Sequence, residues 1–150
     1  MTKNGAILIL DDDKDDQLII KEVFQKLGYP NEVVYFCNGE DAWDYLNSAK
    51  VTPFLIISDI RMPKLDGHEL MTKLQKSQDL RLSSIPYVFV TSAVPEKVLV
   101  DAYANSTQGF FVKPMDYGEL EDIIKCILEY WTRCASPSPL MYRSLTAAAS

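Results

Sequence analysis

Short apolar runs alternate with longer amphipathic segments along almost the whole chain. The runs occupy residues 6–10, 33–36, 54–57, 87–90 and 110–112. Uninterrupted apolar runs of this length are typical of strands that are buried on both faces of a parallel sheet. The pattern therefore predicts five such strands.

The segments between the runs have the spacing of amphipathic helices. Leu18, Ile19, Val23, Phe24 and Leu27 recur at intervals of three and four residues before Gly28, which predicts a helix and its end. Similar stripes follow the four later strands and begin near Ala42, Leu70, Val98 and Leu120. Asn38 is expected to cap the second helix, and Asp116 with Glu119 has the form of a capping box for the last one.

A strand followed by a helix, five times in succession, predicts the α/β class with a five-stranded parallel sheet and helices on both faces. The pattern stops after Arg133. We therefore expect one domain over residues 1–134. Residues 135–150 are rich in Ser, Pro and Ala and are expected to form a disordered C-terminal tail.

The charge, the length of the first apolar run and the cysteines argue against a nucleic-acid partner and against a signal peptide or membrane span. The net charge of −6 disfavours direct binding to the phosphate backbone of a nucleic acid. The first apolar run is too short for a signal-peptide core or a membrane span. Three cysteines without metal-type or redox-type spacing favour a reducing compartment, so a cytoplasmic location is expected.

Polar residues follow four of the predicted strands at the point where each strand ends. Asp11 and Asp12 follow the first strand, Asp59 the third, Thr91 the fourth and Lys113 the fifth. In an open parallel sheet, ligands bind outside the carboxyl ends of the strands. These side chains are therefore expected to meet at one edge of the sheet.

The residue types at this edge suit phosphoryl transfer to a carboxylate. Three carboxylates packed together need a cation to stay ionised, and hard oxygen ligands suit Mg²⁺. A carboxylate can attack phosphorus, while Lys113 and Thr91 can neutralise the charge on the equatorial oxygens. Taken singly, the acids could be a solvated turn and Lys113 the start of a helix. The combination at four separate strand ends favours the functional interpretation.

The motifs ILILDDD, SDIRMPKLDG, VTSA and FFVKP resemble those of the receiver-domain family of response regulators, over about residues 5–133. The resemblance implies a doubly wound, flavodoxin-like sheet of order 2-1-3-4-5 in a three-layer α/β/α arrangement. It also implies a two-component signalling switch, and not an enzyme with a separate substrate. Its phosphoryl group would come from a sensor histidine kinase or a phosphotransfer protein. His68, the single histidine, is expected to be a solvent-exposed turn residue and not the donor.

The resemblance also assigns roles residue by residue. Asp59 would be the phosphoacceptor, contacted through its phosphoryl group by Thr91 and Lys113. The Mg²⁺ ligands would be Asp11 (mostly through a water), Asp12, Asp59 and the backbone carbonyl of Arg61. Thr91 and Phe110 would form the switch, although Phe110 lacks the hydroxyl of the Tyr that is more common there. Arg61 and Ala93 would tune the lifetime of the phosphate.

Output would follow by association, because no second domain is predicted. The switch would couple the site to the face made by the fourth helix, fifth strand and fifth helix, which could bind a downstream protein target or a second copy of the chain. Leu99, Tyr103 and Trp131 could serve a homodimer there, but a place in the core is the expected role of each.

Three alternatives remain for comparison. An aspartyl phosphohydrolase of the dehalogenase type has a second acid two residues after its nucleophile, where this chain has Arg61. A nucleotide-binding module is disfavoured because the chain has neither a GxGxxG nor a GK[ST] loop. A receiver-like interaction module that works without phosphorylation would be expected to lack one of the acids, Thr91 or Lys113.

Overall fold

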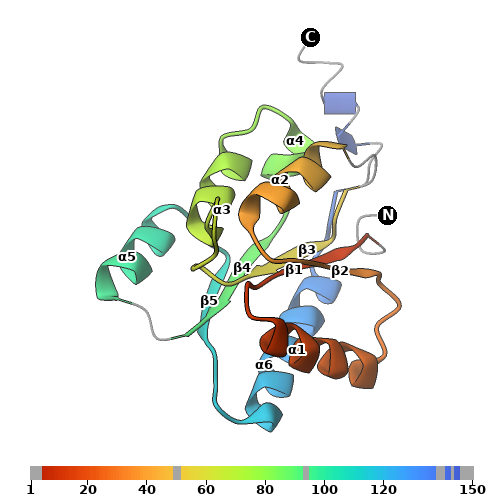
Figure 1. Cartoon of the computed structure of the whole chain (residues 1–150). Coiled ribbons are helices and arrows are strands. Elements are labelled where there is room, and N and C mark those ends of the chain that lie inside the picture. The colour runs from red at the N-terminus through yellow and green to blue at the C-terminus, as the bar shows by residue number, and fades with distance from the viewer. Residues whose placement is uncertain (1–4, 49–51, 93–94, 138–140, 143, 146–150) are drawn as a thin grey trace.

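The centre of the molecule is a parallel sheet with strand order β2-β1-β3-β4-β5 (Figure 1). The computed structural model describes residues 5–48, 52–92, 95–137, 141–142 and 144–145. The strands are β1 (Ile7–Leu10), β2 (Val33–Phe36), β3 (Leu55–Ser58), β4 (Tyr87–Thr91) and β5 (Gly109–Val112). The predicted α/β class and the order 2-1-3-4-5 are confirmed.

Each strand is followed by one or two helices, and the helices cover both faces of the sheet. They are α1 (Lys14–Leu27), α2 (Gly39–Ser48), α3 (Gly67–Gln75), α4 (Leu80–Ser83), α5 (Glu96–Ala104) and α6 (Tyr117–Arg133). The single-turn α4 was not predicted, because four residues are too few to show a helical stripe. Its local signal is Asp79, whose carboxylate accepts a hydrogen bond from the backbone N–H of Arg81.

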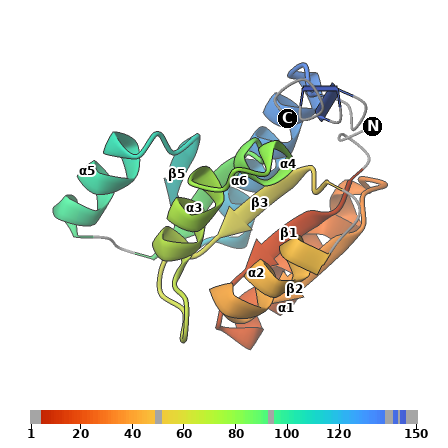
Figure 2. The same cartoon turned by 90° about the horizontal axis from the view of Figure 1, so that it is seen from above.

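Alternate residues of the strands feed two separate cores. On β1, Leu8 and Leu10 pack on the side covered by α2, α3, α4 and α5, whereas Ile7 and Ile9 pack on the side covered by α1 and α6. Figure 1 shows α2, α3 and α4 above the sheet and α1 and α6 below it, and the view from above looks down on the layer of α2, α3 and α4 (Figure 2). Because both faces are covered, β1, β3 and β4 are buried throughout, as their apolar sequences predict.

Side-chain caps fix where the helices begin. Asp13 caps α1 by accepting from the backbone N–H groups of Asp15 and Asp16. Asp66 and Glu69 form a reciprocal capping box at α3, which the sequence analysis did not identify. Asp116 accepts from the N–H of Glu119 at α6, as expected, but the reciprocal bond of the predicted box is not among the hydrogen bonds of the described residues.

The C-terminal segment is described only in part. Helix α6 ends at Arg133, and beyond it the Tyr142 side chain is 9% exposed. Residues 138–140, 143 and 146–150 lie outside the described part, so a disordered tail from residue 135 stays a prediction. Among the described helices, none is long and apolar enough to cross a membrane. A cytoplasmic location also stays a prediction.

Candidate functional site at the carboxyl edge of the sheet

The predicted site residues meet at one edge because hydrogen bonds extend past the strand ends. The backbone N–H of Asp59 donates to the carbonyl of Leu10 (2.8 Å), which places the residue after β3 beside the end of β1. The backbone N–H of Lys113 donates to the carbonyl of Thr91 (2.6 Å) and joins the ends of β5 and β4 in the same way. The structure therefore brings together residues from four strands.

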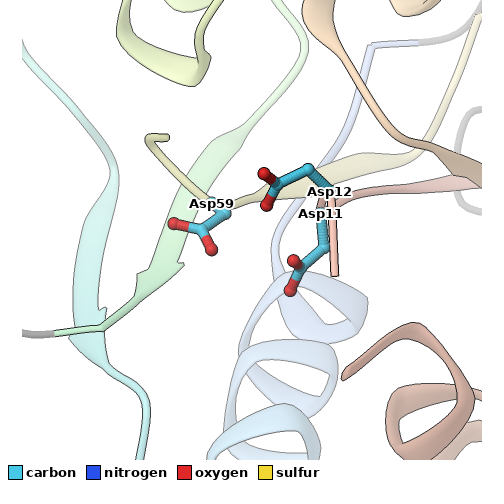
Figure 3. A group of neighbouring side chains, drawn as sticks. All are labelled: Asp11, Asp12 and Asp59. Carbon is cyan, nitrogen blue, oxygen red and sulfur yellow. The ribbon is translucent and has the colours of Figure 1, made fainter. Parts of the chain in front are cut away.

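Three aspartates form an acidic cluster where β1 and β3 end (Figure 3). One carboxylate oxygen from each of Asp11, Asp12 and Asp59 lies within 4.8 Å of the other two. Asp11 and Asp59 are buried, whereas Asp12 is exposed. Oxygen donors at this spacing, with one side open to solvent, are typical of a site for a hard divalent cation.

Lys113 is the cation that the described residues themselves supply to this cluster. Its ammonium donates to Oδ2 of Asp11 (2.6 Å), Oδ2 of Asp16 (2.8 Å) and Oδ2 of Asp59 (3.1 Å). Burial lowers the pKa of Lys113, but the hydrogen bonds to Asp11 and Asp16 and the charges of Asp11 and Asp59 outweigh burial and raise the pKa overall. Lys113 is therefore fully charged at neutral pH.

Burial raises the pKa of Asp11, whereas it lowers that of Lys113, because in both groups it disfavours the charged form. The loss of water raises the pKa of this carboxyl above its ordinary value, although hydrogen bonds from Lys113 and from the N–H of Asp13 act to lower the pKa. The Coulombic effect of Asp59 raises the pKa further. A second positive charge beside Asp11 would therefore relieve an unfavourable accumulation of negative charge.

Both oxygens of Asp59 are held by donors from different strands. Oδ1 accepts from the backbone N–H of Ile60 (2.6 Å) and from the hydroxyl of Thr91, while Oδ2 accepts from Lys113. The Asp59 side chain is 11% exposed. The arrangement presents one carboxylate to the solvent edge with a hydroxyl and an ammonium aimed at it.

Phe110 lies apart from the charged residues, on β5. Its half-buried ring packs against Phe89 of β4, with ring centroids 5.5 Å apart. Leu99 and Tyr103, on the neighbouring α5, are 38% and 55% exposed, whereas Trp131 is half-buried against the core that α1 and α6 cover. The expected place in the core is therefore confirmed for Trp131 and was wrong for Leu99 and Tyr103, which are available to a partner.

Some details differ from the sequence-based expectations. His68 is the second residue of α3 and is half-buried, with a buried Nε2 that has no hydrogen-bond partner among the described residues, so the prediction of an exposed turn residue was wrong. Arg61 is exposed in the loop after Asp59, and Ala93 lies outside the described residues.

Asp16 and Gln17 are site residues that the sequence analysis missed. The first turn of α1 directs Asp16 to Lys113, and the Gln17 amide donates to the carbonyls of Asp11 (2.6 Å) and Phe36 (3.2 Å). Taken as a whole, the acidic run 11–16 does not distinguish Asp16 from its neighbouring acids. The N-cap at Asp13 was the available signal, because it places Asp16 in a first helical turn that begins beside the site.

Comparisons with known proteins agree with this geometry. The family described as the response regulator receiver domain matches residues 7–125. The probable methanogenesis regulatory protein FilR2 of Methanothrix harundinacea (strain 6Ac) is 30% identical over 129 residues, which cover 83% of this chain and 82% of FilR2.

Solved structures resemble the whole fold. The phosphorylated cyanobacterial phytochrome response regulator RcpA has a TM-score of 0.80 at 28% identity, covering 90% of this chain and 99% of RcpA. The Mn²⁺-bound response regulator Rcp1 has a TM-score of 0.78 at 24% identity, covering 89% of this chain and 99% of Rcp1, and this similarity concerns the fold. The matched family, the sheet order and the acidic pocket beside Lys113 together show that the chain belongs to the response regulator receiver domain family, whose members are signalling domains and not classical enzymes.

Proposed function

We propose that the chain is a phosphorylation-dependent response regulator that accepts a phosphoryl group on Asp59. The environment of the Asp59 carboxylate carries this proposal. Thr91 and Lys113 both donate to it, and Asp11 and Asp12 complete an acidic cluster around it. Phosphoryl transfer demands positioning and charge neutralisation more than covalent help from the protein, and these groups supply both.

The transfer itself is a simple displacement. An oxygen of Asp59 bonds to phosphorus while the bond from phosphorus to an imidazole nitrogen of the donor breaks, and the imidazole takes up a proton. Asp59 becomes an acyl phosphate. Lys113 and Thr91 then donate to phosphoryl oxygens in place of the carboxylate oxygens that they contact in this structure.

The donor belongs to another protein, a sensor histidine kinase or a histidine phosphotransfer protein. Receiver-domain membership implies a kinase partner. His68 supports an external donor, because its Nε2 is buried at the start of α3.

The cluster of Asp11, Asp12 and Asp59 fits Mg²⁺. Asp12 and Asp59 would bind the ion through their carboxylates and Asp11 mostly through a water, and the family resemblance adds the backbone carbonyl of Arg61 as a further ligand. Mg²⁺ keeps few protein ligands and commonly shares a phosphate oxygen, and the exposed side of Asp12 leaves space for both water and phosphate. When bound, the ion would neutralise the acids and the phosphoryl oxygens. The raised pKa of Asp11 agrees with a site that needs added positive charge.

Output is proposed to pass through Thr91 and Phe110 to the face formed by α5, β5 and α6. Val100, Tyr103 and Val112 are each more than half exposed there, which suits a downstream protein target or a second copy of the chain. A shift of Thr91 on phosphorylation would change the packing of Phe110 against Phe89 and so bias this face between two states. Residues 1–134 would form the switching unit and residues 135–150 a tail.

Intact mass spectrometry tests the chemistry. The chain is incubated with Mg²⁺ and a small-molecule phosphodonor, with Asp59→Asn as the isosteric test and Asp101→Asn, an exposed acid on α5, as the matched control. We expect one phosphoryl adduct in the wild type and in Asp101→Asn, and none in Asp59→Asn or without Mg²⁺. If the wild type takes up neither phosphate nor beryllofluoride, the protein is an interaction module that works without phosphorylation.

Sedimentation with and without beryllofluoride tests the association. A shift toward a dimer that Tyr103→Glu abolishes would support the face around α5. A monomer under both conditions would rule out the homodimer and leave a separate protein target.

A further inference from the structure

Asp16 contacts the active-site lysine from outside the acidic triad. Its Oδ2 lies 2.8 Å from Nζ of Lys113, closer than the 3.1 Å to Asp59, and the Asp16 side chain is 34% exposed. We infer that Asp16 is a positioning residue that anchors the Lys113 ammonium, so that one donor of this group stays aimed at Asp59 and at the phosphoryl group that forms there. The inference rests on the proposed phosphorylation of Asp59.

The donors of Lys113 show why an anchor matters. An ammonium has three N–H donors, and three carboxylate oxygens take them: those of Asp11, Asp16 and Asp59. Phosphorylation removes the negative charge of the Asp59 carboxylate, so the third donor is released to the phosphoryl oxygens. Asp11 belongs to the triad that would hold the cation. Asp16 is the partner of Lys113 whose charge is neutralised neither by phosphorylation of Asp59 nor by cation binding at Asp11.

Local structure explains how Asp16 reaches the site. The Asp13 cap begins α1 immediately after the acidic cluster, and the N-terminus of a helix favours acids in its first turn. Helix α1 packs on the same face of the sheet as α6, so its first turn borders the loop that carries Lys113. Asp16, Lys113 and Pro114 line one groove at this border. A lysine stem has four flexible carbons, and a fixed anion at its end restricts the positions of the ammonium.

Asp15 provides a matched control for the charge of Asp16. Asp15 is exposed and immediately precedes Asp16 in the same helical turn. Among the described residues, the ion-pair partners of Lys113 are Asp11, Asp16 and Asp59, and not Asp15. Asp16→Ala and Asp15→Ala therefore remove the same charge from the same turn, but only the first removes a contact with Lys113. Asp16→Asn keeps an acceptor oxygen without the charge.

The experiment is a titration of the full chain with beryllofluoride at saturating Mg²⁺, in which binding is monitored through the backbone amide NMR spectrum. We expect Asp16→Ala to raise the half-saturating concentration roughly fivefold, with Asp16→Asn between it and the wild type and Asp15→Ala unchanged. In a Lys113→Gln background the effect of Asp16→Ala should vanish, which a role in folding alone would not produce.

Three results would overturn the inference. Tighter binding in both Asp16 variants would show that Asp16 acts as a repulsive charge. Equal effects of Asp16→Ala and Asp15→Ala would show a general effect of the helix terminus. Persistence of the effect in Lys113→Gln would show that Lys113 is not the intermediary. A wild type that binds no beryllofluoride would instead refute the proposed function, so the two failures are distinguishable.

Discussion

Gly67→Ala is expected to damage both stability and phosphorylation, although Gly67 touches no substrate. A Cβ at this position would lie 2.0 Å from the carbonyl oxygen of Asp59 and 2.7 Å from Oγ of Ser58. The first neighbour is backbone and cannot rotate away. An ordinary contact of 3.4 Å requires the start of α3 and the end of β3 to separate by about 1.4 Å, a change that the hydrogen bond from Gly67 N–H to Ile60 O opposes.

The magnitude follows from this displacement. Overpacking a well-packed site costs about 1–3 kcal/mol, and a clash with backbone belongs at the upper end. For a chain of this size, about 3 kcal/mol corresponds to a fall in Tm of roughly 6–12 °C. Because the clash is with Asp59 itself, we also expect the rate of phosphorylation to fall about 100-fold, since a shift of about 1 Å in a reacting group can cost that much.

Scanning calorimetry and intact mass against time measure the two effects. Gly118→Ala, in the first turn of α6, is the control, because its Cβ would lie 3.3 Å from the Asp116 oxygen that caps this helix, only about 0.1 Å short of an ordinary contact, so a small adjustment keeps the cap. We expect the control to keep the Tm and the rate of the wild type. A Gly67→Ala protein with the wild-type Tm and rate would refute the argument from close approach.

Two further predictions concern the cation and pH. Asp12→Asn should weaken Mg²⁺ binding roughly tenfold by calorimetric titration, because ligand charge sets affinity, while unfolding without Mg²⁺ changes little since Asp12 is exposed; unchanged affinity would remove Asp12 from the ligand set. Burial raises the pKa of Tyr87 above its ordinary value of 10.0, so its phenol contributes stability fully below pH 10 and loses it as the pH rises further. In urea unfolding at increasing pH, the free energy of unfolding of Tyr87→Phe should be lower than that of the wild type below pH 10, because the carbonyl of Gly67 loses its hydrogen-bond donor. Above pH 10 this free energy should fall less steeply with pH in Tyr87→Phe than in the wild type, and equal slopes would contradict the prediction.

Sequence patterns predicted the strand ends well because two signals coincide there. Residues 6–10 and 54–57 are apolar on both faces of a strand, and Asp11 and Asp59 follow where burial gives way to the solvent edge. The missed helix α4 and the burial of His68 show the limits of pattern. A four-residue helix and a single half-buried side chain show no periodic pattern, and their burial depends on which tertiary neighbours pack against them.

By itself, the sequence determined the α/β class and the residues that gather at the carboxyl edge. Apolar runs followed by polar residues specify which positions are buried and where each strand ends, and parallel strands align those ends. Only the tertiary structure decided the contacts among these residues. The ion pair of Asp16 with Lys113 joins residues 97 apart in sequence, and the approach of Gly67 to Asp59 depends on how α3 packs against β3. Such distances result from the packing of whole helices and strands against one another, which local periodicity does not encode.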